Sequence, residues 1–74
     1  MERNVTIYYK NSNGKNARLQ YKAMAMQAGP AWQILGKEDA AGNGIPQNAP
    51  LIMLRLADGG TATFDADNVT ILFD

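Results

Sequence analysis

Two segments near the start of the chain alternate between apolar and polar positions. In residues 5–10 (VTIYYK) and residues 17–23 (ARLQYKA), the odd-numbered positions are apolar or aromatic. The even-numbered positions are Thr6, Tyr8 and Lys10 in the first segment and Arg18, Gln20 and Lys22 in the second. A period of two with β-branched and aromatic residues is typical of a strand that buries one face. The pattern predicts two half-buried strands.

The linker between these strands decides which side chains lie opposite one another. A two-residue turn on Asn13 and Gly14 would pair Ile7 with Gln20 and mix apolar with polar positions on one face. A three-residue loop, with Gly14 in the left-handed conformation, pairs Ile7 with Leu19 and Tyr8 with Arg18. We therefore predict the three-residue loop.

The same test applies to residues 51–66, which contain a second pair of apolar segments. A three-residue loop of Asp58, Gly59 and Gly60 pairs Leu54 with Phe64 and Leu56 with Ala62, so that both faces match. This arrangement predicts a second hairpin with Gly60 in the left-handed position.

Residues 64–70 (FDADNVT) could form either a metal site or a turn. A calcium loop that begins at Asp65 would need an oxygen ligand at position 5 and glycine at position 6, where the chain has Val69 and Thr70. The apolar phase changes from even positions before Ala66 to odd positions from Val69 onwards, and Asp-Asn pairs favour short turns. We predict a turn and a short final strand, and no metal site.

The segment FDADNV resembles the Phe-Pro-x-Asn-Tyr-Val segment of Src-homology-3 domains, which are small barrels that end in a strand, a tight turn and a short strand. The chain has no Ala-Leu-Tyr-Asp-Tyr segment, and Trp32 is its only tryptophan. The resemblance therefore implies barrel geometry and does not extend to the binding of proline-rich ligands.

The middle of the chain admits two interpretations. Strong helix formers in residues 23–28 precede Gly29 and Pro30, so a helix at about residues 17–28 is one alternative. A helical wheel separates Arg18 and Lys22 from Gln20, which leaves no single polar face and favours a long bent strand. Residues 31–35 (AWQIL) are a further strand candidate, and residues 36–50 are interpreted as a long loop.

These patterns predict an all-β domain that spans residues 1–74, a small five-stranded Src-homology-3-like barrel or sandwich. The alternative is an α+β domain with the helix at about residues 17–28. At 74 residues the core is small, and about 60% of the surface of the unfolded chain can be buried.

Composition excludes several kinds of chemistry. The chain has no cysteine and no histidine, so it offers no thiolate nucleophile and no imidazole base. We therefore expect a protein that is not an enzyme and that uses no cofactor. The longest apolar run, residues 49–54, is far shorter than the roughly 20 residues of a membrane helix. We expect no signal peptide, no membrane segment and a cytoplasmic location.

Charge is unevenly distributed although the net charge is zero. Residues 1–37 carry six basic side chains and one acidic, whereas residues 38–74 carry one basic and six acidic. Such asymmetry is expected of a basic face for an acidic partner, of head-to-tail association in a homodimer, or of attraction between the two halves of one domain.

The candidate contact residues follow from the predicted first hairpin and the long loop. They are Tyr8, Lys10, Arg18, Gln20, Lys22 and, in the loop, Lys37. Basic residues beside an aromatic ring suit an acidic protein surface, which we favour, or single-stranded nucleic acid. The simpler alternative is a solvated face on which Arg18 covers Tyr8.

A third alternative is an inhibitor from a phage or mobile element. In that role Asp58, Asp65 and Asp67 would imitate the phosphates of a nucleic acid on a host protein.

Overall fold

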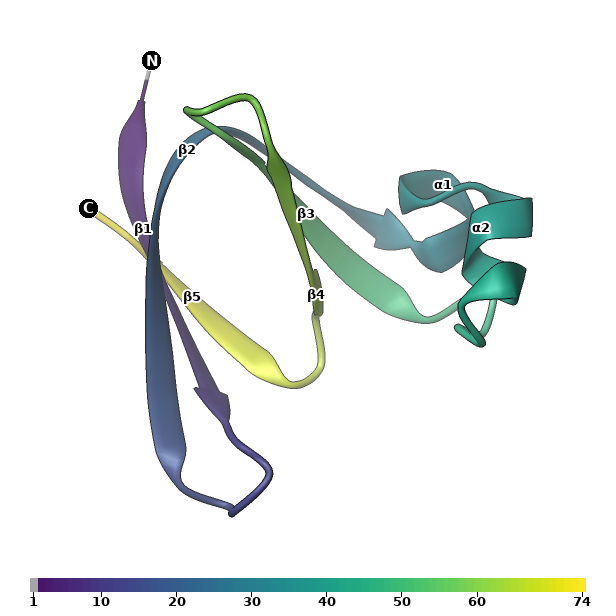
Figure 1. Ribbon diagram of the computed structural model, residues 1–74, viewed down its shortest axis with the longest axis horizontal. Helices are drawn as coiled ribbons and strands as arrows, with labels where there is room; N and C mark the ends of the chain where they lie inside the picture. Colours follow the sequence, from purple (N-terminus) through teal and green to yellow (C-terminus); the bar gives the residue numbers. More distant parts are fainter. Residues whose placement is uncertain (1) are drawn as a thin grey trace.

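A computed structural model describes residues 2–74, and in this part of the chain it is mostly β, with five strands and two short helices (Figure 1). The elements in chain order are β1 (Arg3–Lys10), β2 (Asn16–Pro30), α1 (Ala31–Ile34), α2 (Lys37–Gly42), β3 (Pro50–Leu56), β4 (Thr61–Asp65) and β5 (Val69–Phe73). The strands form one antiparallel sheet in the order β4-β3-β2-β1-β5. The prediction of a mostly β domain is confirmed. The sheet is not closed, because β4 and β5 are its two edges.

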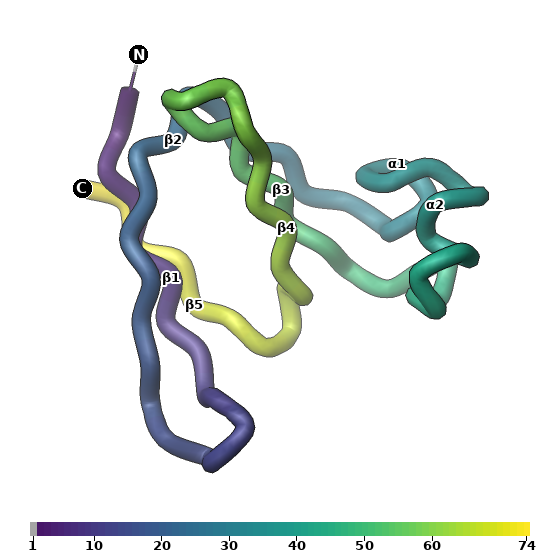
Figure 2. Tube along the Cα trace, in the orientation of Figure 1, coloured from purple at the N-terminus to yellow at the C-terminus, as the bar shows by residue number. Residues whose placement is uncertain are grey.

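The long strand β2 connects the two ends of the sheet. Its first part pairs with β1 up to Ala23, and its second part pairs with β3 from Ala23 to Pro30. The register shifts between Ala23 and Ala25, so Met24 is an extra residue that bends the strand. Figure 2 shows β2 running from the β1 hairpin across the molecule to the helices. The alternative of a helix at about residues 17–28 is therefore wrong.

The first hairpin has the predicted register. Ile7 lies opposite Leu19, and Tyr8 lies opposite Arg18. Gly14 has a φ of 75°, and its N–H donates to the carbonyl of Asn11 at 2.9 Å. The three-residue loop of Ser12, Asn13 and Gly14 is therefore the one predicted from the matching of apolar and polar faces.

The second hairpin differs from the predicted register by two residues. Leu54 lies opposite Ala62, not Phe64, and Gly59 rather than Gly60 has the positive φ, at 94°. A shift of two leaves every side chain on the same face, so the alternation of apolar residues cannot distinguish the two registers. The Oδ1 atom of Asp58 accepts a hydrogen bond of 2.8 Å from the N–H of Gly60, which favours the observed loop.

Residues 31–50 form a helical arm, which corrects two predictions. Residues 31–35 are not a strand, because α1 occupies Ala31–Ile34, and the predicted loop contains α2. Gly36, with a φ of 90°, separates the two helices. Acidic residues Glu38 and Asp39 occupy the first turn of α2, where they favour a helix by interaction with its dipole.

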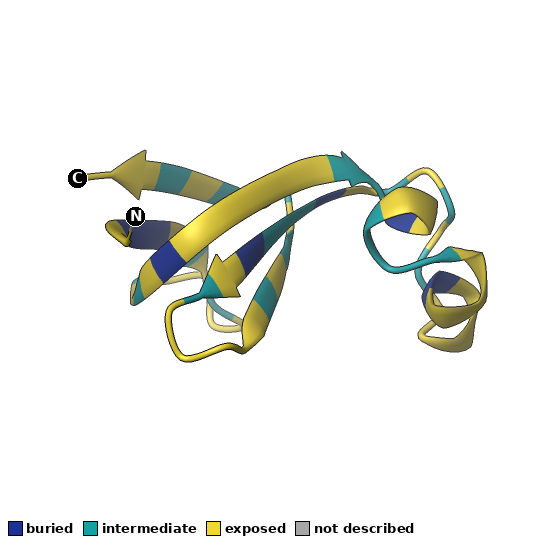
Figure 3. Cartoon of the chain, turned by 90° about the horizontal axis from the view of Figure 1, so that it is seen from above, coloured by how far each residue is buried: buried dark blue, intermediate teal, exposed yellow. Residues whose placement is uncertain are grey.

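The buried apolar residues, which are among those coloured dark blue in Figure 3, form two separate clusters. The sheet core consists of Val5, Ile7, Ala23 and Leu54, with partly buried Tyr21, Leu56, Phe64, Val69 and Ile71 packed against it. The arm core consists of Ala31, Ala40 and Leu51, with Ile34, Leu35, Ile45 and Ala49 around them. The sheet core lies beneath the odd-numbered positions of β1, as the alternation predicts.

The predicted turn between β4 and β5 is present. The N–H of Asn68 donates to the Asp65 carbonyl at 3.1 Å, and the side-chain amide of Asn68 donates to Oδ2 of Asp65 at 2.6 Å. The N–H of Asp67 donates to Oδ1 of Asp65 at 3.1 Å. These bonds explain why the apolar phase changes between Ala66 and Val69.

Candidate binding face

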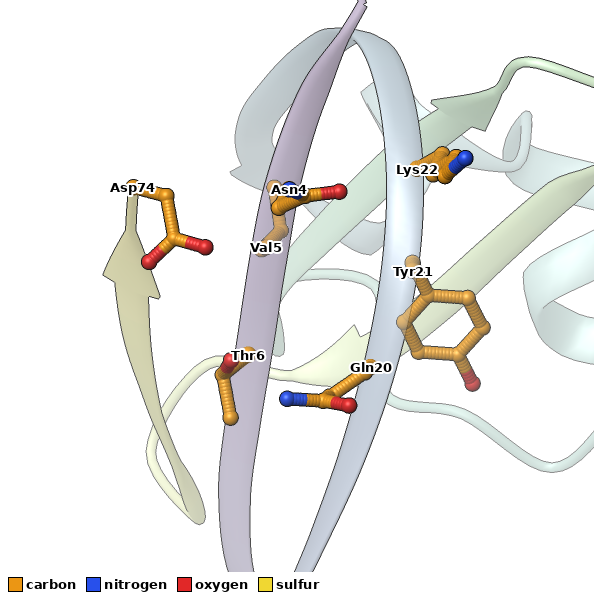
Figure 4. A pocket seen from close by; sticks show the side chains of 7 residues that line it. All are labelled: Asn4, Val5, Thr6, Gln20, Tyr21, Lys22 and Asp74. Carbon is orange, nitrogen blue, oxygen red and sulfur yellow. The ribbon is translucent and has the colours of Figure 1, made fainter.

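The even-numbered positions of β1 and of residues 16–22 in β2 share the face of the sheet that points away from the core. We call this surface the outer hairpin face and define it by Tyr8, Lys10, Arg18, Gln20 and Lys22. Tyr8 lies directly opposite Arg18, and the partners of Gln20 and Lys22 on β1 are Thr6 and Asn4. Figure 4 shows Asn4, Thr6, Gln20 and Lys22 along the two adjacent strands. The structure therefore brings together five of the six predicted contact residues.

The charged groups of this face are almost free of partners within the protein. Within residues 2–74, the side chains of Tyr8, Lys10, Arg18 and Gln20 make no hydrogen bond or ion pair. The ammonium of Lys22 lies 3.9 Å from Oε1 of Glu2, and the Lys22 side chain is 68% exposed. An exposed pair of this kind contributes about 0–1 kcal/mol, so Lys22 can exchange Glu2 for another acidic group.

Arg18 does not cover Tyr8. In the described part of the chain, the guanidinium that lies over an aromatic ring is that of Arg3, 5.3 Å from the centre of Phe73. Tyr8 is 40% exposed. The ring and the Arg18 guanidinium thus remain available as two separate contact groups.

Strand β5 extends the same face on the other side of β1. Tyr8 lies opposite Thr70, and Thr6 lies opposite Leu72, which is 53% exposed. Thr6, enclosed by strands on both sides, is only 7% exposed. Sequence reasoning missed Leu72, although its even position between inward Ile71 and Phe73 is a signal for the outer face.

The acidic residues are distributed around this face and not on it. Residues 3–37 contain no aspartate or glutamate. Lys10 borders a shallow depression with Asp67, Asn68 and Thr70, but no ion pair forms there within the described residues. The Asp74 side chain borders another depression at the opposite end of the face, next to Asn4 (Figure 4). The outer hairpin face is thus positive in its middle and bordered by acidic groups.

Lys37 lies apart from the other candidates. It begins α2, which Figure 1 places at the far end of the molecule from the β1–β2 loop. Its carbonyl accepts a hydrogen bond of 3.0 Å from Nε2 of Gln47, so its backbone holds the arm together. Lys37 was predicted to be a second contact element in the loop. In the structure it belongs to a surface separate from the outer hairpin face.

The three aspartates considered as phosphate mimics do not form one cluster. Asp58 precedes β4, whereas Asp65 ends that strand and Asp67 follows it. The carboxylates of Asp58 and Asp65 also accept backbone hydrogen bonds within their own turns. Their local role is to shape the two turns.

Neither a metal centre nor a membrane helix is visible in residues 2–74. This part of the chain contains no group of three or more acidic side chains placed to hold a metal ion. None of its helices has the length and apolar character needed to cross a membrane. Comparison of the chain with protein-family models, with curated proteins and with solved structures found no match.

Proposed function

We propose that this chain is a non-enzymatic binding protein whose outer hairpin face takes an acidic surface of another protein. One observation carries the proposal: three cations, Lys10, Arg18 and Lys22, share an exposed face with Tyr8, and only Lys22 has an ionic partner among the described residues. Tyrosine and arginine are the residue types that most often anchor protein interfaces.

The placement of the face on strands supports this role. The side chains point outward from a sheet whose opposite face carries Val5 and Ile7, which are 1% and 0% exposed. A packed core beneath a face limits the movement of the backbone that carries the contact groups. Less conformational freedom is then lost when a partner binds. The proposal includes a cytoplasmic location, which rests on composition alone.

The second candidate function is binding of single-stranded nucleic acid by the same face. The exposed ring of Tyr8 beside Arg18 favours it, because a base can stack on the ring while the guanidinium contacts a phosphate. Net charge distinguishes the two candidate functions. The net charge of the chain is zero, whereas nucleic-acid-binding domains are usually strongly basic. We therefore rank the acidic protein first.

The test is capture of partners from a nuclease-treated lysate by the tagged chain and by the double variant Arg18→Glu, Lys22→Glu. The proposal predicts that the variant loses a specific protein, because two attractive contacts become repulsive. The matched control is Lys37→Glu, Arg55→Glu, which changes the net charge equally but lies on α2 and β3. This control should retain the partner.

Three results decide between the alternatives. Loss of the partner in the face variant alone supports the acidic protein surface. Capture that disappears with nuclease, and that falls steeply with salt in the absence of nuclease, supports nucleic acid. Equal capture by wild type and the face variant contradicts both functions and assigns the outer hairpin face to solvent.

A further inference from the structure

The first part of β2 has a strand neighbour on one side only. Residues 16–22 pair with β1, whereas β3 reaches β2 only from Ala23 onwards, apart from one bond between the Ala57 N–H and the Lys22 carbonyl of 2.9 Å. In the described chain no strand lies along the other side of residues 16–20. These residues are exposed except Ala17, which is half-buried. They therefore form an accessible strand edge.

The hydrogen-bond ladder shows which backbone groups point to this edge. The N–H of Asn11 donates to the Lys15 carbonyl at 2.9 Å, so Asn11 and Lys15 form a bonded pair. Bonded and non-bonded pairs alternate in an antiparallel ladder, so Ala17 and Leu19 direct their backbone groups to β1. Asn16, Arg18 and Gln20 then direct theirs to the open edge. The bond from Ala57 to Lys22 lies on this same side and agrees with the alternation.

The side chains along the edge have two different characters. On the outer face are Arg18, Gln20 and Lys22, and on the inner face are Ala17 and Leu19, of which Leu19 is 38% exposed. Arg18 and Lys22 are four residues apart, about 13 Å along a strand. An extended segment at this edge would place every second side chain beside the cations and the others beside Leu19.

We propose that the partner binds as an added β-strand, through an extended segment in which acidic and apolar residues alternate. The proposal rests on the proposed function and specifies its mode. The backbone groups of Arg18 and Gln20 supply the hydrogen bonds, and the cations select acidic side chains at alternate positions. Charge complementarity selects this occupant, since Arg18 has no ionic partner within residues 2–74 and Lys22 has only the exposed Glu2, 3.9 Å away.

The probe is a capped seven-residue peptide in which glutamate and valine alternate, beginning and ending with glutamate. Its control has the same composition with the four glutamates first and the three valines last. The proposal predicts that the alternating peptide binds wild type about tenfold more tightly than the control, because only the alternating peptide places all its glutamates on the face of the cations and all its valines on the face of Leu19. On binding, the amides of Arg18 and Gln20 should gain protection from hydrogen exchange.

The matched variants are Gln20→Pro and Gln20→Ala. Proline removes an N–H that points to the edge and is not used in the pairing with β1, whereas alanine keeps it. Gln20→Pro should therefore bind the alternating peptide about tenfold more weakly than Gln20→Ala, which lacks the same side chain but keeps the N–H. If Gln20→Pro does not fold, the exchange protection of Arg18 and Gln20 in wild type decides the question alone.

The outcomes separate the mode from the function. If the two peptides bind equally and the amides of Arg18 and Gln20 gain no protection from exchange, strand addition is overturned. The proposal that the side chains of the outer hairpin face bind an acidic partner is then unaffected. Binding of neither peptide overturns strand addition, and the capture experiment then judges the function independently. A wild-type dimer in sedimentation that Gln20→Pro converts to monomer assigns the edge to a second copy and also overturns the proposal.

Discussion

The sheet core and the arm core differ in the size and origin of their side chains. The sheet core is built on Val5, Ile7 and Leu54, which come from strands far apart in the sequence. The arm core combines two alanines, Ala31 and Ala40, with Leu51, all within residues 31–51. Larger buried side chains remove more apolar surface from water, so the sheet core contributes more to stability.

This difference relates stability to the proposed binding. The outer hairpin face lies over the sheet core, which packs β1 and β2 against β3, β4 and β5. The arm contacts the sheet through Leu51 on β3, and α1 follows directly after Pro30, the last residue of β2. Regions with few large buried side chains open at lower free energy than the rest of a domain. We therefore expect the arm to open locally while the hairpin stays folded.

The largest effect is expected from Leu54→Ala in the sheet core. Leu54 is 0% exposed, and loss of its side chain should lower the free energy of unfolding by about 2–5 kcal/mol. Urea denaturation followed by circular dichroism measures this change. Leu72→Ala is the control, because Leu72 is 53% exposed and should cost less than about 1 kcal/mol. Equal losses in the two variants would contradict the assignment of the core.

Leu51→Ala tests the arm core with the same chemical change. Leu51 is 6% exposed. Its replacement by alanine should lower the free energy of unfolding by about 2 kcal/mol, the low end for such substitutions, because small neighbouring side chains can move into the space. Native-state hydrogen exchange should show faster exchange at the amides of Ala31 and Ala40, while Ile7 is unchanged. Acceleration at Ile7 equal to that in the arm would show that the two cores unfold as one unit.

Two glycines of the arm give opposite effects with the same substitution. Gly36 has a φ of 90°, which L-residues avoid, so Gly36→Ala should destabilise by about 1 kcal/mol. Gly42 lies in α2 without a positive φ and with open space at its Cβ position, so Gly42→Ala should stabilise the helix by about 0.5–1 kcal/mol. Hydrogen exchange of the arm amides measures both changes in stability. A loss of stability in Gly42→Ala would be evidence against α2.

The smallest effect is expected at the surface of the hairpin. Glu2→Gln removes the ion pair with Lys22, which joins two side chains that are 51% and 68% exposed. The free energy of unfolding should change by less than about 0.5 kcal/mol, and raised salt should remove the difference. A larger change would show that surface charge, as well as packing, stabilises the sheet end of the molecule.

Local patterns predicted much of the sheet and of the candidate face. The alternation in residues 5–10 and 17–23 determined both strands, the register of the first hairpin and the common face of Tyr8, Arg18 and Lys22. The phase change between Ala66 and Val69 located the last turn. The alternation of side chains and the left-handed conformation of Gly14 depend on residues that are close in the sequence. They can therefore be predicted without knowledge of the tertiary structure.

The helical arm could not be predicted in the same way. Residues 31–35 contain a short apolar run that suits either a strand or a helix. The N–H groups of Ala31 and Trp32 bond to the carbonyls of Ala49 and Gln47, at 2.8 and 3.1 Å, in a segment that sequence alone leaves unplaced. Contact between residues so far apart decides between two conformations of similar local preference.

The sequence by itself therefore determined the strands of the first hairpin, their register and the separation of cations from apolar side chains. Tertiary structure alone decided that β5 lies beside β1, which brings Leu72 next to the outer hairpin face, and that one edge of β2 stays open. The physical reason is the range of the interactions: side-chain alternation is local, whereas the choice of strand neighbours depends on how distant segments share one core.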